Sequence, residues 1–149
     1  MDLMGRKVLI QEGKALQLFA GEIMKTISSA KKLTHLIPFA EKLEKYLNRA
    51  QQTSFHLFGK ASQNPEEFLA DASLYLEYIG ILTISWQWLR QGITAQEAFD
   101  RGSSENDFYK GKLMAMRYFF EYELVKMDGL GKRLVSDDMV TVEMKGEWF

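Results

Sequence analysis

The side chains best suited to chemistry in this chain are few, and their spacing does not favour catalysis. Neither His35 nor His56 has a carboxylate or a second histidine three or four residues away in the pattern of a metal site. Glu121 and Glu123 form a carboxylate pair, and such pairs can act as acid and base. Residues two apart point to different faces of a helix. We therefore expect one glutamate to meet solvent and the other to pair with a lysine or arginine across the fold.

The basic residues do not form an evident phosphate site. Neither the Rossmann glycine pattern nor the P-loop pattern occurs in the sequence. Arg6 and Lys7 are suited to contact a cofactor phosphate or a carboxylate on a neighbouring domain, but the simpler interpretation is that both are solvated. Lys110, Lys112 and Arg117 are flanked by acidic residues, which indicates a charge-balanced, solvated face. The sequence thus predicts no catalytic, cofactor-binding or metal-binding residue in this chain.

Composition narrows the class of protein. The chain has 149 residues, 46% of them apolar and 13% aromatic, so it has ample material for a core. Its net charge of −1 argues against nucleic-acid binding, which needs clustered positive charge. The lack of cysteine excludes disulfides and thiolate chemistry and fits a cytoplasmic location. The most apolar run, residues 74–89, is shorter than the roughly 20 residues of a membrane span, and no secretory signal is visible.

Apolar residues recur at steps of three and four, and the chain has only two prolines. Both observations predict an all-α protein. Asn64 and Pro65 form the clearest helix start, with a capping residue followed by proline at the first helical position. We expect Gly92 to end that helix. The sequence predicts an up-and-down bundle of four long helices plus a short one, followed by an irregular C-terminal arm. In chain order, the expected helices cover residues 14–32, 38–58, 65–92, 94–101 and 105–127.

The third long helix is apolar nearly all the way round. One apolar stripe contains Phe68, Tyr75 and Leu82. A second stripe runs from Leu74 to Trp88. A helix that is hydrophobic on every side has to be covered on every side. Aromatic stripes at helical spacing are most often core. The surplus nevertheless predicts a face that is covered by another chain or by another domain. The residues that we expect at this interface are Leu74, Tyr78, Ile81 and Trp88.

Three segments carry a resemblance to a known family. The opening Asp2-Leu3-Met4-Gly5-Arg6-Lys7 is similar to a D-L-x-G-R-K segment, and residues 75–88 are similar to Y-L-x-x-x-G-x-x-x-x-x-W-x-W. Residues 108–119 are similar to F-Y-x-x-K-x-x-x-A-R-F-F, with Met116 in place of the usual alanine. In this order the three segments resemble the C-terminal helical domain of bacterial acyl-CoA dehydrogenases, the acetyl-CoA dehydrogenase C-terminal-like domain, as in 3-methylmercaptopropionyl-CoA dehydrogenase-type enzymes.

The resemblance implies a parent flavoprotein that uses FAD to oxidise an acyl-CoA to the 2,3-enoyl-CoA. The catalytic glutamate and most flavin contacts would belong to sequence upstream of Met1. Residues 1–13 would then be the end of the catalytic domain's helical region, and residues 14–149 the C-terminal bundle. The expected role of this chain is to pack on the catalytic domain of its parent or to hold a homo-oligomer together. The alternative is a free-standing helical protein-interaction module with no enzymatic activity.

Overall fold

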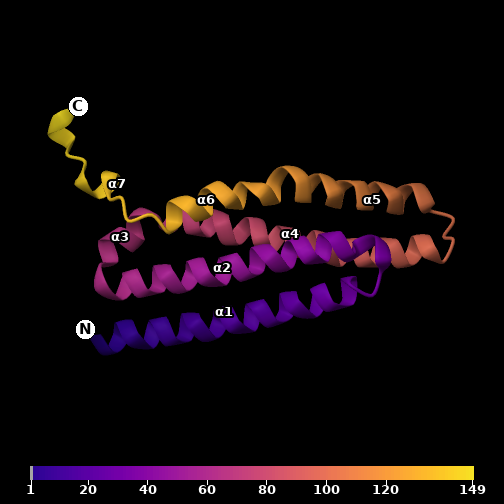
Figure 1. Ribbon diagram of the computed structural model, residues 1–149, viewed down its shortest axis with the longest axis horizontal. Coiled ribbons are helices and arrows are strands. Elements are labelled where there is room, and N and C mark those ends of the chain that lie inside the picture. Colours follow the sequence, from indigo (N-terminus) through magenta and orange to yellow (C-terminus); the bar gives the residue numbers. More distant parts are fainter. Residues whose placement is uncertain (1) are drawn as a thin grey trace.

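The computed structural model describes the backbone of residues 2–149 and the side chains of residues 11–149. Over this range the protein is all-α and contains no strand, as the sequence predicted. Three of the long rods are α1 (Asp2–Ala30), α2 (Ile37–Gln63) and α4 (Ala72–Asp100). The fourth rod is built from α5 (Asn106–Tyr118) and α6 (Met127–Leu134). The rods run alternately up and down the long axis of the molecule (Figure 1).

The first connection follows the sequence signals closely. A 3₁₀ turn, η1 (Thr34–Leu36), leads directly into α2, and Pro38 lies in the first turn of that helix, where its missing N–H is tolerated. By contrast, α1 passes through Gly13 without the break that we expected there. The assignment of residues 1–13 to the end of the catalytic domain stays a prediction.

The third long helix begins and ends differently from the prediction. The short helix α3 (Pro65–Ala70) starts at Pro65 as predicted, but the chain turns at Asp71 before α4 begins. Helix α4 continues through Gly92, so the predicted stop at Gly92 and the separate helix over residues 94–101 were wrong. The true stop is Gly102, which has a φ of 73°. This left-handed conformation is the one that glycine commonly adopts just after a helix ends.

The fourth rod is interrupted rather than continuous. A π-helical segment, η2 (Phe119–Glu123), and a 3₁₀ turn, η3 (Leu124–Lys126), join α5 to α6. Helix α6 then runs through Gly129 and Gly131 to Leu134, so the last helical rod extends beyond the end that we expected at residue 127. A β-carbon at Gly131 would lie 3.5 Å from a ring carbon of Tyr78 on α4. This is an ordinary van der Waals distance, so α6 and the Tyr78 ring are packed in contact at this glycine.

The C-terminal arm is irregular, as predicted. It contains α7 (Val140–Glu143) and a 3₁₀ turn, η4 (Gly146–Trp148), and it extends away from the end of the bundle (Figure 1). The last residue, Phe149, is 92% exposed.

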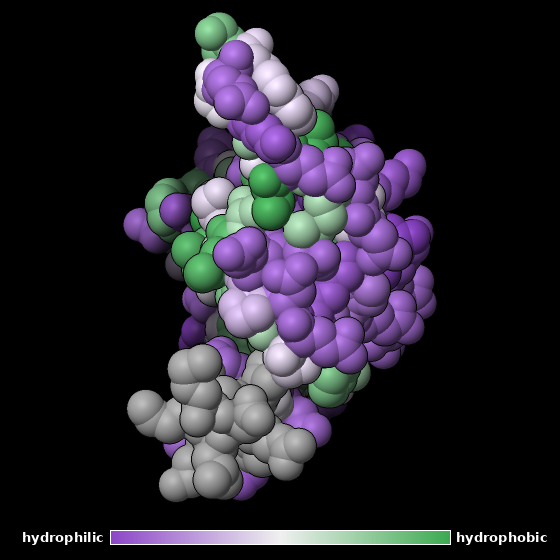
Figure 2. Space-filling view, turned by 90° about the vertical axis from the view of Figure 1, so that its left-hand side faces the viewer, coloured by the Kyte–Doolittle hydropathy of each residue, from purple (hydrophilic) through white to green (hydrophobic). Residues whose placement is uncertain are grey.

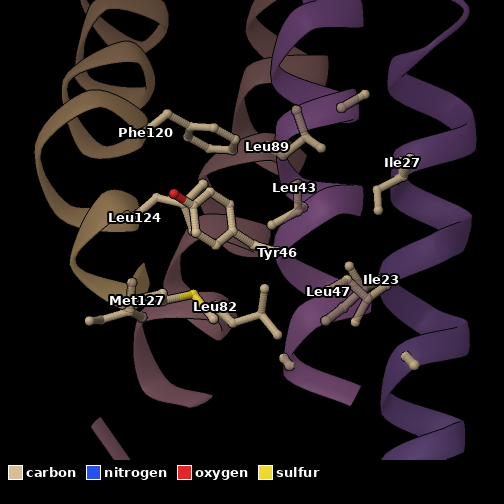
Figure 3. Packing of buried hydrophobic residues seen from close by; sticks show 14 of the residues in the cluster. Ile23, Ile27, Leu43, Tyr46, Leu47, Leu82, Leu89, Phe120, Leu124 and Met127 are labelled. Carbon is tan, nitrogen blue, oxygen red and sulfur yellow. The ribbon is translucent and has the colours of Figure 1, made fainter. Parts of the chain in front are cut away.

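The core lies along the centre of the four rods, and side chains from all of them meet there (Figure 3). Along η1 and α2, a stripe of positions at steps of three and four residues is buried, which agrees with the periodicity that predicted this helix. These positions are Leu36, Ala40, Leu43, Leu47, Ala50, Ser54 and Leu57.

Candidate functional site

The four residues predicted at an interface do not form one uncovered face. Tyr78 and Ile81 are buried by the chain's own helices, with 2% and 9% of their surface exposed. Leu74 and Trp88 are partly buried and pack against the core. The predicted face is therefore not open at Tyr78, whose hydroxyl lies against Thr53 on α2 and whose ring lies against Gly131 on α6, nor at the buried Ile81. That Leu74 and Trp88 contact a partner stays a prediction.

The exposed apolar surface of α4 lies on another side of the helix. Leu76 and Ile84 are 72% and 48% exposed, and they stand eight residues apart with Gly80 between them. This spacing places all three on one face of the helix, which we call the outer face of α4. A β-carbon at Gly80 would meet open space. In the end-on view of Figure 2, hydrophilic residues cover most of the right-hand part of the visible surface, and hydrophobic patches lie to the upper left of them.

A polar cluster joins α2 to α6 across the bundle. The Arg49 Nη1 group donates a hydrogen bond to Asp128 Oδ1 at 2.8 Å, and the Tyr46 hydroxyl donates to Asp128 Oδ2 at 3.2 Å. Burial raises the pKa of Tyr46 to about 12, and the Asp128 carboxylate beside the phenol adds to this rise. Tyr46 therefore stays protonated at neutral pH and acts as a hydrogen-bond donor that holds the carboxylate in place.

Two pairs of hydroxyls lie between α2 and α4. The hydroxyls of Thr53 and Tyr78 are 3.3 Å apart, and those of Ser54 and Tyr75 are 2.8 Å apart. Burial raises the pKa of both tyrosines, although the hydrogen bond from each partner hydroxyl opposes that rise. Each pair satisfies polar groups that would otherwise be unpaired in the core.

The polar cluster and the Thr53–Tyr78 pair line a hollow between α2 and α6, which we call the α2–α6 groove. It has a volume of about 640 Å³ and is open to solvent. Cationic side chains stand at its rim, and the hydroxyls of Tyr46, Thr53 and Tyr78 contribute to its lining. The full lining consists of Lys45, Tyr46, Arg49, Gln52, Thr53, His56, Tyr78, Met127, Asp128, Gly131, Lys132 and Val135.

The carboxylates that the sequence singled out are engaged in ion pairs. Glu121 lies 3.5 Å from the Lys42 ammonium on α2, and Glu123 lies 2.9 Å from Lys126 on its own helix turn. The predicted pairing of one glutamate across the bundle is thereby confirmed for Glu121. Glu121 therefore ties the fourth rod to α2, whereas Glu123 pairs within that rod, and the two glutamates are engaged separately rather than as an acid and a base.

The remaining candidates are scattered. His35 lies in η1, whereas His56 lies in α2 and lines the groove. Within the described part of the chain, no three His, Cys, Asp or Glu side chains are placed to hold a metal ion. The side chains of Arg6 and Lys7 lie outside the described residues.

The sequence interpretation missed the groove because its parts are far apart in the chain. Arg49 and Asp128 are 79 residues apart, and Tyr46 and Asp128 are 82 apart. One local signal was present: Lys45, Arg49, Gln52 and His56 recur at steps of four and three along α2. That pattern gives a polar stripe, but it does not say which helix packs beside it.

The chain is thus a helical bundle with one apolar outer face and one polar groove. Residues 19–145 match the protein family described as acetyl-CoA dehydrogenase C-terminal like. The chain belongs to this family, because the match spans most of its 149 residues. Comparison with curated proteins finds no match. No helix in the described part of the chain is both long enough and apolar enough to cross a membrane.

Proposed function

We propose that this chain is the non-catalytic C-terminal domain of an FAD-dependent acyl-CoA dehydrogenase. The parent enzyme would oxidise an acyl-CoA to the 2,3-enoyl-CoA, and the motifs favour a parent of the 3-methylmercaptopropionyl-CoA dehydrogenase type. The observation that carries the proposal is the family match over residues 19–145. In this role the bundle packs on the catalytic domain or holds subunits of a homo-oligomer together.

The outer face of α4 is the surface that best suits such packing. Helix α4 is central in the fold, with α1, α2, α5 and α6 all in contact with it. The other helices of the bundle therefore cover the buried side of α4. The large apolar side chains that α4 leaves to solvent include Leu76 and Ile84, and the small Gly80 between them allows another backbone to approach closely.

The described residues do not fit a flavin. The α2–α6 groove has long charged side chains at its rim and paired hydroxyls in its lining, and it is not a narrow apolar slot for a flat ring system. In our proposal the FAD therefore belongs to the catalytic domain. This chain contributes shape and contact surface.

The gene region upstream of the Met1 codon gives the first test. An open reading frame that continues upstream and encodes a flavin dehydrogenase domain would support the proposal. A stop codon and a ribosome-binding site directly before Met1 would overturn it in favour of a free-standing interaction module.

The second test acts on the docking surface in the full-length gene product. The variant Leu76→Glu/Ile84→Glu puts two charges on the outer face. We expect the variant enzyme to bind less FAD or to elute from gel filtration at the apparent mass of a smaller assembly. The matched control Leu18→Glu/Phe55→Glu adds the same charge at two exposed apolar residues of α1 and α2. If both variants matched the wild type in FAD content and in elution on gel filtration, docking through α4 would be contradicted.

A further inference from the structure

The α2–α6 groove has a concentration of positive charge, of which the Arg49–Asp128 ion pair uses only a part. Its lining includes the cations Lys45, Arg49 and Lys132 against the single carboxylate of Asp128. Three cations against one carboxylate leave a net charge of +2 with His56 neutral, on a chain whose overall charge is −1. An excess of this sign in a concave site attracts anions.

The carboxylate in the groove is already neutralised. Asp128 accepts hydrogen bonds from Arg49 at 2.8 Å and from Tyr46 at 3.2 Å, and so both of its oxygens are engaged. Among the side chains that the structure describes, no carboxylate lies within ion-pair distance of Lys45 or Lys132. The guanidinium of Arg49 uses only Nη1 for Asp128, which leaves further N–H donors for a second oxyanion.

The lining supplies a neutral donor as well. Thr53 and Tyr78 carry two hydroxyl protons between them, and the 3.3 Å hydrogen bond that joins them consumes one. The other proton remains for an oxygen atom in the groove. Because burial raises the pKa of Tyr78, this phenol stays protonated at neutral pH. Gly131 lines the groove beside Tyr78 and adds no side chain to it.

The size and charge of the groove indicate the class of ligand. Its volume of about 640 Å³ is that of a small-molecule pocket, and it is larger than a single phosphate needs. A phosphate dianion matches the net charge of +2, and arginine binds phosphate oxygens with two N–H groups at once. We propose that the α2–α6 groove binds a phosphate-bearing small molecule, with Lys45, Arg49 and Lys132 as the anion ligands and the Thr53–Tyr78 pair as an added donor.

Calorimetric titration of the purified chain tests this binding directly. The probes are inorganic phosphate and pyrophosphate, each added at constant ionic strength set with potassium chloride. We expect saturable binding of at least one probe. Tighter binding of pyrophosphate indicates the phosphate group of a larger molecule, whereas preference for inorganic phosphate indicates the free ion. Absence of saturable binding of both probes at millimolar concentration would overturn the proposal.

Variants separate a specific site from general attraction. Lys45→Ala/Lys132→Ala removes two exposed rim cations, and we expect affinity to fall at least about tenfold. Lys14→Ala/Lys110→Ala removes the same charge from two exposed lysines that do not line the groove, and it should bind as the wild type does. Lys45→Arg/Lys132→Arg should retain binding. Equal loss in both alanine variants would refute a site in this groove, and circular dichroism checks that each variant is folded.

Discussion

The outer face of α4 and the α2–α6 groove lie on the same bundle but are built on different principles. The outer face presents Leu76 and Ile84 to solvent, and no polar contact organises it. The groove is organised by hydrogen bonds from Arg49 and Tyr46 to one carboxylate, and cations surround it. An apolar face gains free energy when another surface removes it from water, whereas a charged groove gains by exchanging water for an oxyanion. The first suits a protein partner and the second a small anion.

The contrast within α4 gives the largest expected effect. Leu82 is 1% exposed in the core, whereas Leu76 on the outer face of the same helix is 72% exposed. We expect Leu82→Ala to lower the free energy of unfolding by about 2–5 kcal/mol, because it leaves a cavity among packed side chains. Leu76→Ala should change it by less than about 0.5 kcal/mol. Urea denaturation of both variants measures the difference.

Equal losses in the two leucine variants would mean that Leu76 is covered in the isolated chain. The outer face would then not be available for docking, and the comparison of the two surfaces would fail.

Two glycines of α4 provide a second matched pair. A β-carbon at Gly92 would lie 2.4 Å from the Met116 sulfur, whereas one at Gly80 would meet open space. We expect Gly92→Ala to destabilise the bundle by up to about 2 kcal/mol, because displacing the buried Met116 side chain costs about 1–3 kcal/mol and the helix preference of alanine offsets about 1 kcal/mol of it. Gly80→Ala should stabilise it by about 0.5–1 kcal/mol, because alanine favours the helix. Thermal unfolding followed by circular dichroism gives both signs.

The glycine pair also tests docking. If the outer face meets another backbone at Gly80, the alanine that stabilises the chain should weaken its assembly with the parent enzyme. Stabilisation together with unchanged assembly would argue for contact through side chains alone.

Much of this fold could be predicted from local pattern, and the exceptions have a common cause. The seam of α2 and the start at Pro65 follow from periodicity and capping, which are properties of neighbouring residues. Gly92 lies inside α4 beside the Met116 side chain of α5, which occupies the space of a β-carbon there. The π segment at Phe119–Glu123 had no local signal that we could identify. A glycine next to a partner helix and a glycine at a stop look alike in sequence.

The two surfaces were unequally predictable for the same reason. Excess apolar residues on α4 were visible in the sequence, but the side left to solvent was not, so Tyr78 and Ile81 were misplaced. The groove needs Asp128 from α6 beside Arg49 from α2, and no local pattern states that pairing. The sequence of one helix thus predicts that it has an excess of apolar residues. Which of its faces is exposed depends on how several helices pack together.

The smallest expected effect concerns the tyrosine that holds the groove together. The folded-state pKa of Tyr46 is about 12 against an ordinary value of 10.0, so the unfolded chain loses this proton first. Deprotonation therefore favours unfolding, and the contribution of Tyr46 to stability is present below pH 10.0 and is lost as the pH rises towards about 12. Tyr46→Phe should cost about 0.5–1.5 kcal/mol at neutral pH through the lost hydrogen bond to Asp128.

The alkaline behaviour distinguishes this role from simple packing. Tyr46→Phe should also flatten the decline of stability above pH 10.0, although part of the decline remains because burial raises the pKa of Tyr75 and Tyr78 as well. Tyr118→Phe, which alters an exposed ring on α5, serves as the matched control and should keep the wild-type decline. An unchanged decline in Tyr46→Phe would show that the phenol does not hold Asp128 in solution. The groove would then be less ordered than the contacts of Arg49 and Tyr46 imply. The outer face of α4 and the α2–α6 groove would then differ in polarity alone, and not in the order of their side chains.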